Sequence, residues 1–132
     1  MDFELSQHAK GGYVVVELRG ELDVTTVPML RPALHALLDG TTPRIILDLA
    51  ELTFIDSSAQ TAIVIADRRA RQLGVTFALA APQRIVARVI AITGLDQHFP
   101  VYPTLAEAVA DFQGPPAGSP TRAVDGDTLA PG

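Results

Sequence analysis

The sequence predicts an α/β domain built on a mixed β-sheet. Three short runs of apolar and β-branched residues are typical of buried strands: residues 13–18, 44–49 and 75–80. They alternate with longer segments whose apolar residues recur at helical spacing, which predicts strand–helix–strand units with parallel pairing and right-handed crossovers. The chain has 132 residues, of which 48% are hydrophobic, and suits one domain of roughly 100–150 residues. We expect about four or five strands and about four helices.

Composition excludes several functional classes. The chain has no Cys, which excludes a disulfide scaffold, thiolate zinc sites and a cysteine nucleophile. Its net charge of −5 and its isoelectric point near 5.0 argue against nucleic-acid binding, which normally needs a basic patch. No apolar run approaches the ~20 residues of a membrane span, and the N-terminus lacks the pattern of a signal peptide. We therefore expect a cytoplasmic protein with neither nucleic acid nor membrane as a partner.

The N-terminal third predicts a hairpin followed by a helix. Residues 13–18 form the second strand of this hairpin, residues 3–5 form the first, and His8 to Gly12 form the connection. Thr25-Thr26-Val27-Pro28 predicts a helix start, with a hydroxyl cap and a proline in the first turn. The apolar face of this helix comprises Val27, Leu30, Leu34, Leu37 and Leu38. Gly40 ends the helix, and the strand of residues 44–49 follows.

A second helix is expected to begin at Asp56-Ser57-Ser58 and to end at Gly74. Its buried stripe is expected to comprise Ala59, Ala62, Ile63, Ala66, Ala70 and Leu73. The residues expected on its solvent side are Asp67, Arg68, Arg69, Arg71 and Gln72. After the strand of residues 75–80, Pro82 is expected to open a third helix that stops near Gly94. The apolar residues of that helix are Ile85, Val86, Val89 and Ile90.

The C-terminal part predicts a short strand, a last helix and a tail. Val101-Tyr102 is the expected strand, and the capping-box pattern Thr104-Leu105-Ala106-Glu107 predicts a helix that runs through Phe112. From Gly114 onward the chain is rich in proline and glycine, so it cannot bury enough apolar surface to order itself. We therefore expect a folded domain at residues 1–113 and a disordered tail at residues 114–132.

Familiar catalytic and cofactor motifs are absent from the sequence, which has no GxGxxG, HExxH or GxSxG pattern and no phosphate-binding loop. The three histidines are far apart and lack metal-ligand spacing: His8, His35 and His98. We expect no metal, no other cofactor and no enzymatic activity. A serine hydrolase stays open as an alternative, because Ser57 or Ser58 could meet a histidine and Asp48 or Asp56 in space.

The segment Asp56-Ser57-Ser58 has the clearest potential for regulation. All three residue types favour helix N-caps, and one of them suffices to stabilise the helix start by ~1 kcal/mol. Hydroxyls in the first helical turn lie beside free backbone N–H groups and the positive end of the helix dipole. Such a location also suits a phosphoryl group carried by a serine. A helix cap and a phosphorylation site are therefore both open interpretations of this segment.

Four segments of the sequence together carry a family resemblance. They are Gly20-Glu21-Leu22-Asp23, Val27-Pro28-Met29-Leu30, Ile46-Leu47-Asp48-Leu49 and Phe54-Ile55-Asp56-Ser57-Ser58. In their order and spacing they resemble STAS domains and, among these, the bacterial anti-sigma factor antagonists, also called anti-anti-sigma factors. The resemblance extends over the whole of the expected folded domain and implies the STAS fold.

The resemblance implies a binding module that is switched by phosphorylation and is a substrate, not an enzyme. In the family the second serine of the Asp-Ser-Ser motif, here Ser58, is phosphorylated by the anti-sigma factor, a serine-protein kinase; Ser57 is the alternative. The unphosphorylated antagonist binds this kinase and releases a sigma factor, which regulates transcription. Asp23 is implied to lie near the acceptor serine. The implied partner-binding residues are Asp23, Thr25, Asp56, Ser57, Ser58, Ala59, Gln60 and Thr61.

The same family also suggests an alternative: an adaptor that is never phosphorylated, in a stressosome-like or transporter-associated complex. The family usually continues with Gly-Leu-Gly after Asp-Ser-Ser, whereas this chain has Ala59-Gln60-Thr61, and this difference favours the adaptor. Val64 and Ile65 are expected in the core, on a wide apolar helix face. If they were exposed, they would form a docking patch.

Overall fold

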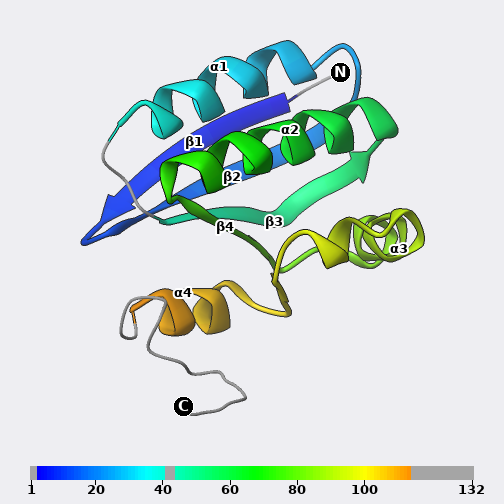
Figure 1. Ribbon diagram of the computed structural model, residues 1–132. Helices are drawn as coiled ribbons and strands as arrows, with labels where there is room; N and C mark the ends of the chain where they lie inside the picture. Colours follow the sequence, from blue (N-terminus) through cyan, green and yellow to red (C-terminus); the bar gives the residue numbers. More distant parts are fainter. Residues whose placement is uncertain (1–2, 41–43, 114–132) are drawn as a thin grey trace.

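The computed structural model describes residues 3–40 and 44–113, and the expected tail at residues 114–132 lies outside the described part. Within it, a five-stranded mixed sheet has the strand order β1-β2-β3-β4-β5 (Figure 1). The strands are β1 (Phe3–Lys10), β2 (Tyr13–Leu22), β3 (Arg44–Ile55), β4 (Thr76–Ala80) and β5 (Val101–Tyr102). The helices are α1 (Val27–Leu38), α2 (Ser57–Leu73), α3 (Arg84–Thr93), the 3-10 turn η1 (Leu95–Gln97) and α4 (Leu105–Gln113). The predicted α/β class and mixed sheet are confirmed.

The first two strands form a tight hairpin. β1 pairs antiparallel with β2 along its whole length, and Gly11-Gly12 alone makes the turn. Gly12 has φ +91°, a conformation that glycine adopts without strain and that two-residue hairpins need. The prediction that the connection begins at His8 is wrong, because this short turn lets the pairing continue to Lys10. His8 lies within β1, opposite Val15.

The other neighbouring strands pair in parallel, as the strand–helix–strand pattern predicts. β3 is longer than expected: it continues past Leu49 to Ile55, because its pairing with β2 extends to Leu22 opposite Ile55. The chain therefore leaves the sheet at Asp56, one residue after the last strand pair. This register sets the position of the functional site.

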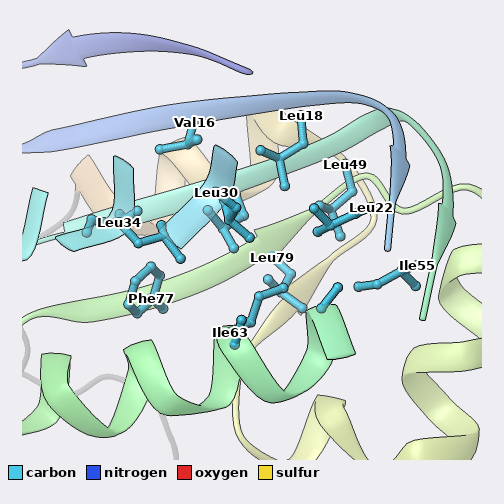
Figure 2. Packing of buried hydrophobic residues seen from close by; sticks show 14 of the residues in the cluster. Val16, Leu18, Leu22, Leu30, Leu34, Leu49, Ile55, Ile63, Phe77 and Leu79 are labelled. Atoms are coloured by element: carbon cyan, nitrogen blue, oxygen red, sulfur yellow. The ribbon is translucent and has the colours of Figure 1, made fainter. Parts of the chain in front are cut away.

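Two apolar cores lie on opposite faces of the sheet. On one face, helices α1, α2 and α3 pack on the strands, with Leu18, Leu30 and Ile63 among the buried side chains (Figure 2). On the other face, Ala108 of α4 packs in a smaller core with side chains that include Val15. Figure 1 shows α4 across the sheet from α1 and α2. Among residues 3–40 and 44–113, no helix is both long and apolar enough to cross a membrane.

The surface of α2 differs from the expected one at three positions. Asp67, expected on the solvent side, is 6% exposed, because it follows Ile63 by four residues and shares its face. Its carboxylate pairs with Arg71 at 2.8 Å. Leu73, expected in the buried stripe, is 44% exposed, because it lies in the last turn of the helix. Ile65, expected in the core, is 54% exposed.

Helix α3 begins two residues later than expected. Gln83 is its N-cap residue, so Pro82 precedes the helix and does not open it. The helix packs on the core through Val86 and Ile90. Ile85, expected on the apolar face, is exposed, because adjacent helical residues point about 100° apart.

Candidate functional site

The site lies at the carboxyl ends of two neighbouring parallel strands. Because Leu22 in β2 lies opposite Ile55 in β3, the loop of residues 23–26 meets the start of α2. The backbone N–H of Asp56 donates to the carbonyl of Leu22 at 3.1 Å. The N–H of Val24 donates to Oδ2 of Asp56, also at 3.1 Å. Two segments more than thirty residues apart in the sequence therefore form one surface.

Asp56 is the N-cap of α2 and connects the parts of the site. Its Oδ1 accepts hydrogen bonds from the backbone N–H of Ala59 at 3.0 Å and from the hydroxyl of Ser58 at 2.6 Å. Burial by itself raises the pKa of Asp56, but the hydrogen bonds from Ser58, Ala59 and Val24 outweigh it, so the pKa is lowered. The carboxylate is therefore held in its ionised form, with donors on both oxygens.

Asp23 organises the neighbouring loop. Its Oδ1 accepts from the hydroxyl of Thr25 at 2.6 Å and from the backbone N–H of Thr25 at 2.9 Å. The hydrogen bond from the Thr25 hydroxyl is the main cause that lowers the pKa of Asp23. Thr26 is the N-cap residue of α1, as expected, but its hydroxyl donates to the carbonyl of Glu21 and does not cap the helix. The Asp23 carboxylate therefore orders the loop at the start of α1, and the loop reaches the start of α2 through Val24.

The residues after Asp56 divide into exposed and buried ones. Ser57 and Thr61 are exposed and lie one turn apart, with the Thr61 hydroxyl donating to the Ser57 carbonyl at 2.9 Å. Ser58 is half-buried, and Ala59 is fully buried. Gln60 is 7% exposed, so its side chain faces into the protein and offers little surface to a partner.

Gln60 joins α2 to α3. Its Oε1 accepts a short hydrogen bond from the hydroxyl of Thr93, and its Nε2 donates to the carbonyl of Asp56 at 3.4 Å. This role was not predicted from the sequence, although Gln60 precedes the buried Ile63 by three residues and so shares its helix face. That spacing is the signal that predicts a buried Gln60.

The histidines do not complete a catalytic triad with the serines. The hydroxyl of Ser58 is bonded to Asp56. His98 lines a groove along α2 that also includes Ser57, and its backbone carbonyl accepts a hydrogen bond from Arg71 at 2.9 Å. The other two histidines lie on β1 and α1. Within the described ranges, no hydrogen bond joins a histidine side chain to Ser57 or Ser58, so the structure gives the hydrolase alternative no base in place. In the same part of the chain, no cluster of histidine and acidic side chains could hold a metal ion.

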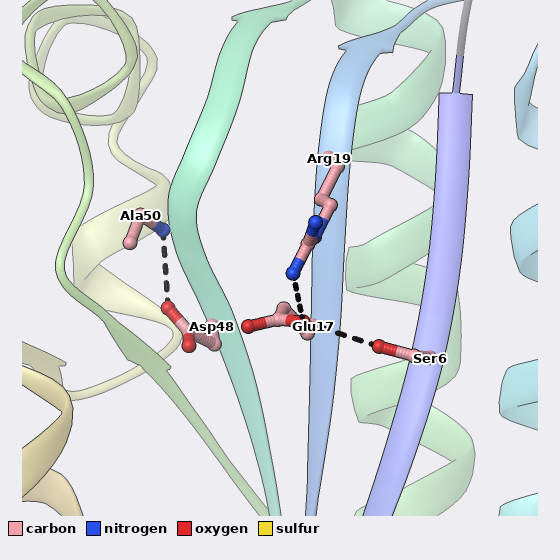
Figure 3. A network of polar contacts seen from close by, with 5 residues as sticks. All are labelled: Ser6, Glu17, Arg19, Asp48 and Ala50. Atoms are coloured by element: carbon pink, nitrogen blue, oxygen red, sulfur yellow. Dashed lines mark hydrogen bonds and ion pairs between the residues drawn. The ribbon is translucent and has the colours of Figure 1, made fainter.

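A second polar cluster lies on the α4 side of the sheet. Asp48 is 6% exposed and accepts from the backbone N–H of Ala50 at 3.1 Å. Burial raises its pKa. Glu17 of β2 lies opposite Asp48 (Figure 3). Glu17 accepts a hydrogen bond from Arg19 at 3.0 Å, and this bond is the main cause that lowers the pKa of Glu17. Asp48 therefore lies on the opposite face of the sheet from α2 and its serines. Burial of its carboxylate destabilises the fold, and the apolar residues around it in the sequence do not reveal this cost.

Comparison with known proteins places these features in a family. Residues 5–108 match the family model of the STAS domain. A Thermotoga neapolitana homologue of the protein TM1081 is 37% identical over 71 residues, which cover 54% of this chain and 63% of that protein's length. The crystal structure of an anti-sigma factor antagonist from Mycobacterium paratuberculosis is 27% identical, with a TM-score of 0.79 over 86% of this chain and 96% of that one.

A further similar protein is known in two states. The structure of the anti-sigma factor antagonist SpoIIAA in its unphosphorylated form is 27% identical, with a TM-score of 0.71 over 87% of this chain and 99% of that one. The structure of Bacillus SpoIIAA in the phosphorylated form is 25% identical, with a TM-score of 0.64 over 83% and 98% of the two chains. The family match covers most of this chain and all five strands in whole or in part. The chain belongs to the STAS domain family, and its relatives include anti-sigma factor antagonists.

Proposed function

We propose that this chain is an anti-sigma factor antagonist whose partner binding is switched by phosphorylation of Ser58. The observation that carries the proposal is the position of the Ser58 hydroxyl in the first turn of α2, beside the exposed Ser57 and hydrogen-bonded to Asp56 at 2.6 Å. The similarity of this chain to SpoIIAA, which has unphosphorylated and phosphorylated forms, supports phosphorylation here as well. The kinase would be the anti-sigma factor itself, and the chain would be its substrate and not an enzyme.

The unphosphorylated surface would contact the anti-sigma factor and so release a sigma factor. The parts of it that a partner can reach are the loop with Asp23 and Thr25 and, on α2, Ser57, Ser58 and Thr61. Val24 adds an apolar side chain that is 68% exposed. Ala59 and Gln60 are buried, so they would not contact the partner directly and would instead position the exposed residues of α2. The departure from Gly-Leu-Gly therefore changes the packing beneath the surface at Ala59 and Gln60 and the contact surface itself at Thr61.

Phosphorylation would abolish binding through charge and not through a large rearrangement. A phosphoryl group adds roughly −1.5 to −2 charge, next to the ionised Asp56 and near Asp23. The dipole of α2 recovers only about 0.3–1 kcal/mol of this repulsion, whereas a thousandfold loss of affinity needs about 4 kcal/mol. Burial of these like charges against a partner is the larger effect, so it would supply the switch.

The test is phosphorylation by the cognate anti-sigma factor with ATP, followed by intact-mass measurement. We expect one phosphoryl group on the wild type and on the matched control Ser57→Ala, and none on Ser58→Ala. A phosphoryl group that persists on Ser58→Ala would move the site, and an unmodified wild type would remove the switch. Calorimetry should then show that the phosphorylated chain binds the anti-sigma factor at least about a thousandfold more weakly than the unmodified chain.

A second candidate function is the unphosphorylated adaptor in a stressosome-like or transporter-associated complex. The exposure of Ile65, at 54%, favours it, because an exposed apolar side chain on a helix is a common anchor of a protein contact. A pull-down separates the two functions. Recovery of other STAS proteins or membrane ATPase subunits, without a serine-protein kinase, would support the adaptor and contradict the antagonist.

A further inference from the structure

A groove runs along α2 on the side that faces α3 and η1. Its volume is about 460 Å³. One wall consists of Thr61, Val64, Ile65 and Arg68 of α2, and the opposite wall includes Leu95 and His98. The groove begins at Ser57, so one end of it is the surface proposed above to contact the anti-sigma factor.

The middle of the groove is apolar. Ile65 is 54% exposed, and Leu95 is buried beneath the groove. Val64 packs partly against the core and partly toward the groove. From Thr61 to Arg68 the wall is about 10 Å long, which matches about two turns of a helix laid against it.

The far end of the groove is basic. Arg68 lines the groove, and within the described residues its guanidinium has no ion pair or hydrogen bond. His98 lies opposite, and no carboxylate is among the described residues that line the groove. The nearest acid on α2, Asp67, is paired with Arg71. A chain with net charge −5 thus presents a free cation at an apolar surface.

We propose that this α2–α3 groove binds an amphipathic acidic segment of the partner protein, with an apolar side chain on Ile65 and a carboxylate on Arg68. Charge complementarity selects an acidic segment, and the apolar wall selects a protein helix over a small anion. The groove is continuous with Ser57, so the segment belongs to the same anti-sigma factor that phosphorylates Ser58. This last step rests on the proposed function, whereas the chemistry of the groove does not.

The groove itself is tested with a probe peptide and the full chain. The probe is a designed amphipathic helical peptide with leucines on one face and glutamates beside them; a second peptide has lysines in place of the glutamates. In amide NMR titrations we expect the glutamate peptide to shift the signals of Val64, Ile65, Arg68 and His98. No localised shifts, or equal binding of the lysine peptide, would overturn the proposal.

Charge-swapped variants provide the matched control. Arg68→Glu should weaken binding of the glutamate peptide at least about tenfold and should improve binding of the lysine peptide. Arg69→Glu makes the same charge change one residue away, on an exposed side chain outside the groove, and should leave both affinities within about twofold. Equal effects of the two variants would show only a change of net charge and would overturn the groove as the site.

The anti-sigma factor tests the link to the proposed function. If it binds the wild type, Arg68→Glu and Ile65→Ser should weaken the complex about tenfold or more, while Arg69→Glu should not. If the affinity of the anti-sigma factor is unchanged by the groove variants, the assignment of the segment to this partner is overturned. Failure of the wild type to bind would instead reject the proposed function, with the peptide titration still deciding on the groove. Self-association that Ile65→Ser abolishes would make a second copy the occupant and overturn the proposal.

Discussion

The hydroxyl of Ser58 donates a 2.6 Å hydrogen bond to Oδ1 of Asp56, the same oxygen that caps α2 through the N–H of Ala59. The other oxygen of Asp56 holds the loop after β2 through Val24. The candidate phosphate acceptor, the helix start and the loop are therefore joined by one carboxylate. A phosphoryl group on Ser58 would replace the hydroxyl donor with a dianion, so this hydrogen bond could not persist.

Asp56→Ala should destabilise the fold. It removes the N-cap of α2 and the bond to Val24, and loss of a cap alone costs about 0.5–2 kcal/mol. Asp56→Asn keeps the acceptor for Ala59 and should cost less. Urea unfolding measures both, with Asp39→Ala as a control, because Asp39 lies at the C-terminal end of α1, where a carboxylate brings no dipole stabilisation. Equal midpoints for Asp56→Ala and the control would contradict the capping role.

The contribution of Asp56 should depend on pH in a defined direction. Its pKa is lower in the folded chain than the ordinary value of 3.8, so its ionised form stabilises the fold. This stabilisation is fully present above the unfolded pKa and is lost as the pH falls through the folded pKa. The difference in unfolding free energy between wild type and Asp56→Ala should therefore be constant near neutrality and shrink below pH 3.8. A difference that grows in acid would be inconsistent with the lowered pKa.

Asp48→Asn should stabilise the protein at neutral pH. Burial raises the pKa of Asp48 above its ordinary value of 3.8, and an acid with a raised pKa destabilises the fold once the pH exceeds the unfolded value. Asparagine keeps an acceptor for Ala50 and removes the charge. Thermal unfolding should show a higher Tm for Asp48→Asn at pH 7 and a smaller gain near pH 3.8. Glu51→Gln, on an exposed neighbour, should change the Tm little at either pH.

Gln60 offers a test of the contact between α2 and α3. Gln60→Ala removes the acceptor of the Thr93 hydroxyl and leaves a void, and should cost about 1–3 kcal/mol. Gln60→Leu fills the void, and Thr93 keeps its bond to the carbonyl of Val89 at 2.8 Å, so this variant should cost less. Chemical unfolding compares them, with the exposed Gln72→Ala as control. A Gln60→Ala protein as stable as Gln72→Ala would contradict a structural role for this side chain.

The local features of the fold were predictable because a few adjacent residues encode them. Asp56 caps α2, Gly74 ends it in the left-handed region, and the Thr104 hydroxyl caps α4 by accepting from the N–H of Glu107. Each needs only a side chain within reach of its own helix end. Periodicity likewise predicted the strands and most of the buried helix faces. The same helical spacing places Gln60 and Asp67 on the buried face with Ile63. Their burial was not predicted because both side chains are polar.

The composition and the alternation of strands and helices were thus sufficient for the fold class, whereas Ser58 became the candidate acceptor only through the resemblance to a known family. The tertiary structure alone decided that Val24 reaches Asp56, because this depends on the register of β2 against β3, which joins residues 32 positions apart. It also decided that Ile65 stays exposed beside Arg68, which has no ion pair with any residue that the structure describes. Exposure depends on which neighbouring element covers a residue, and no local pattern in the chain specifies that neighbour.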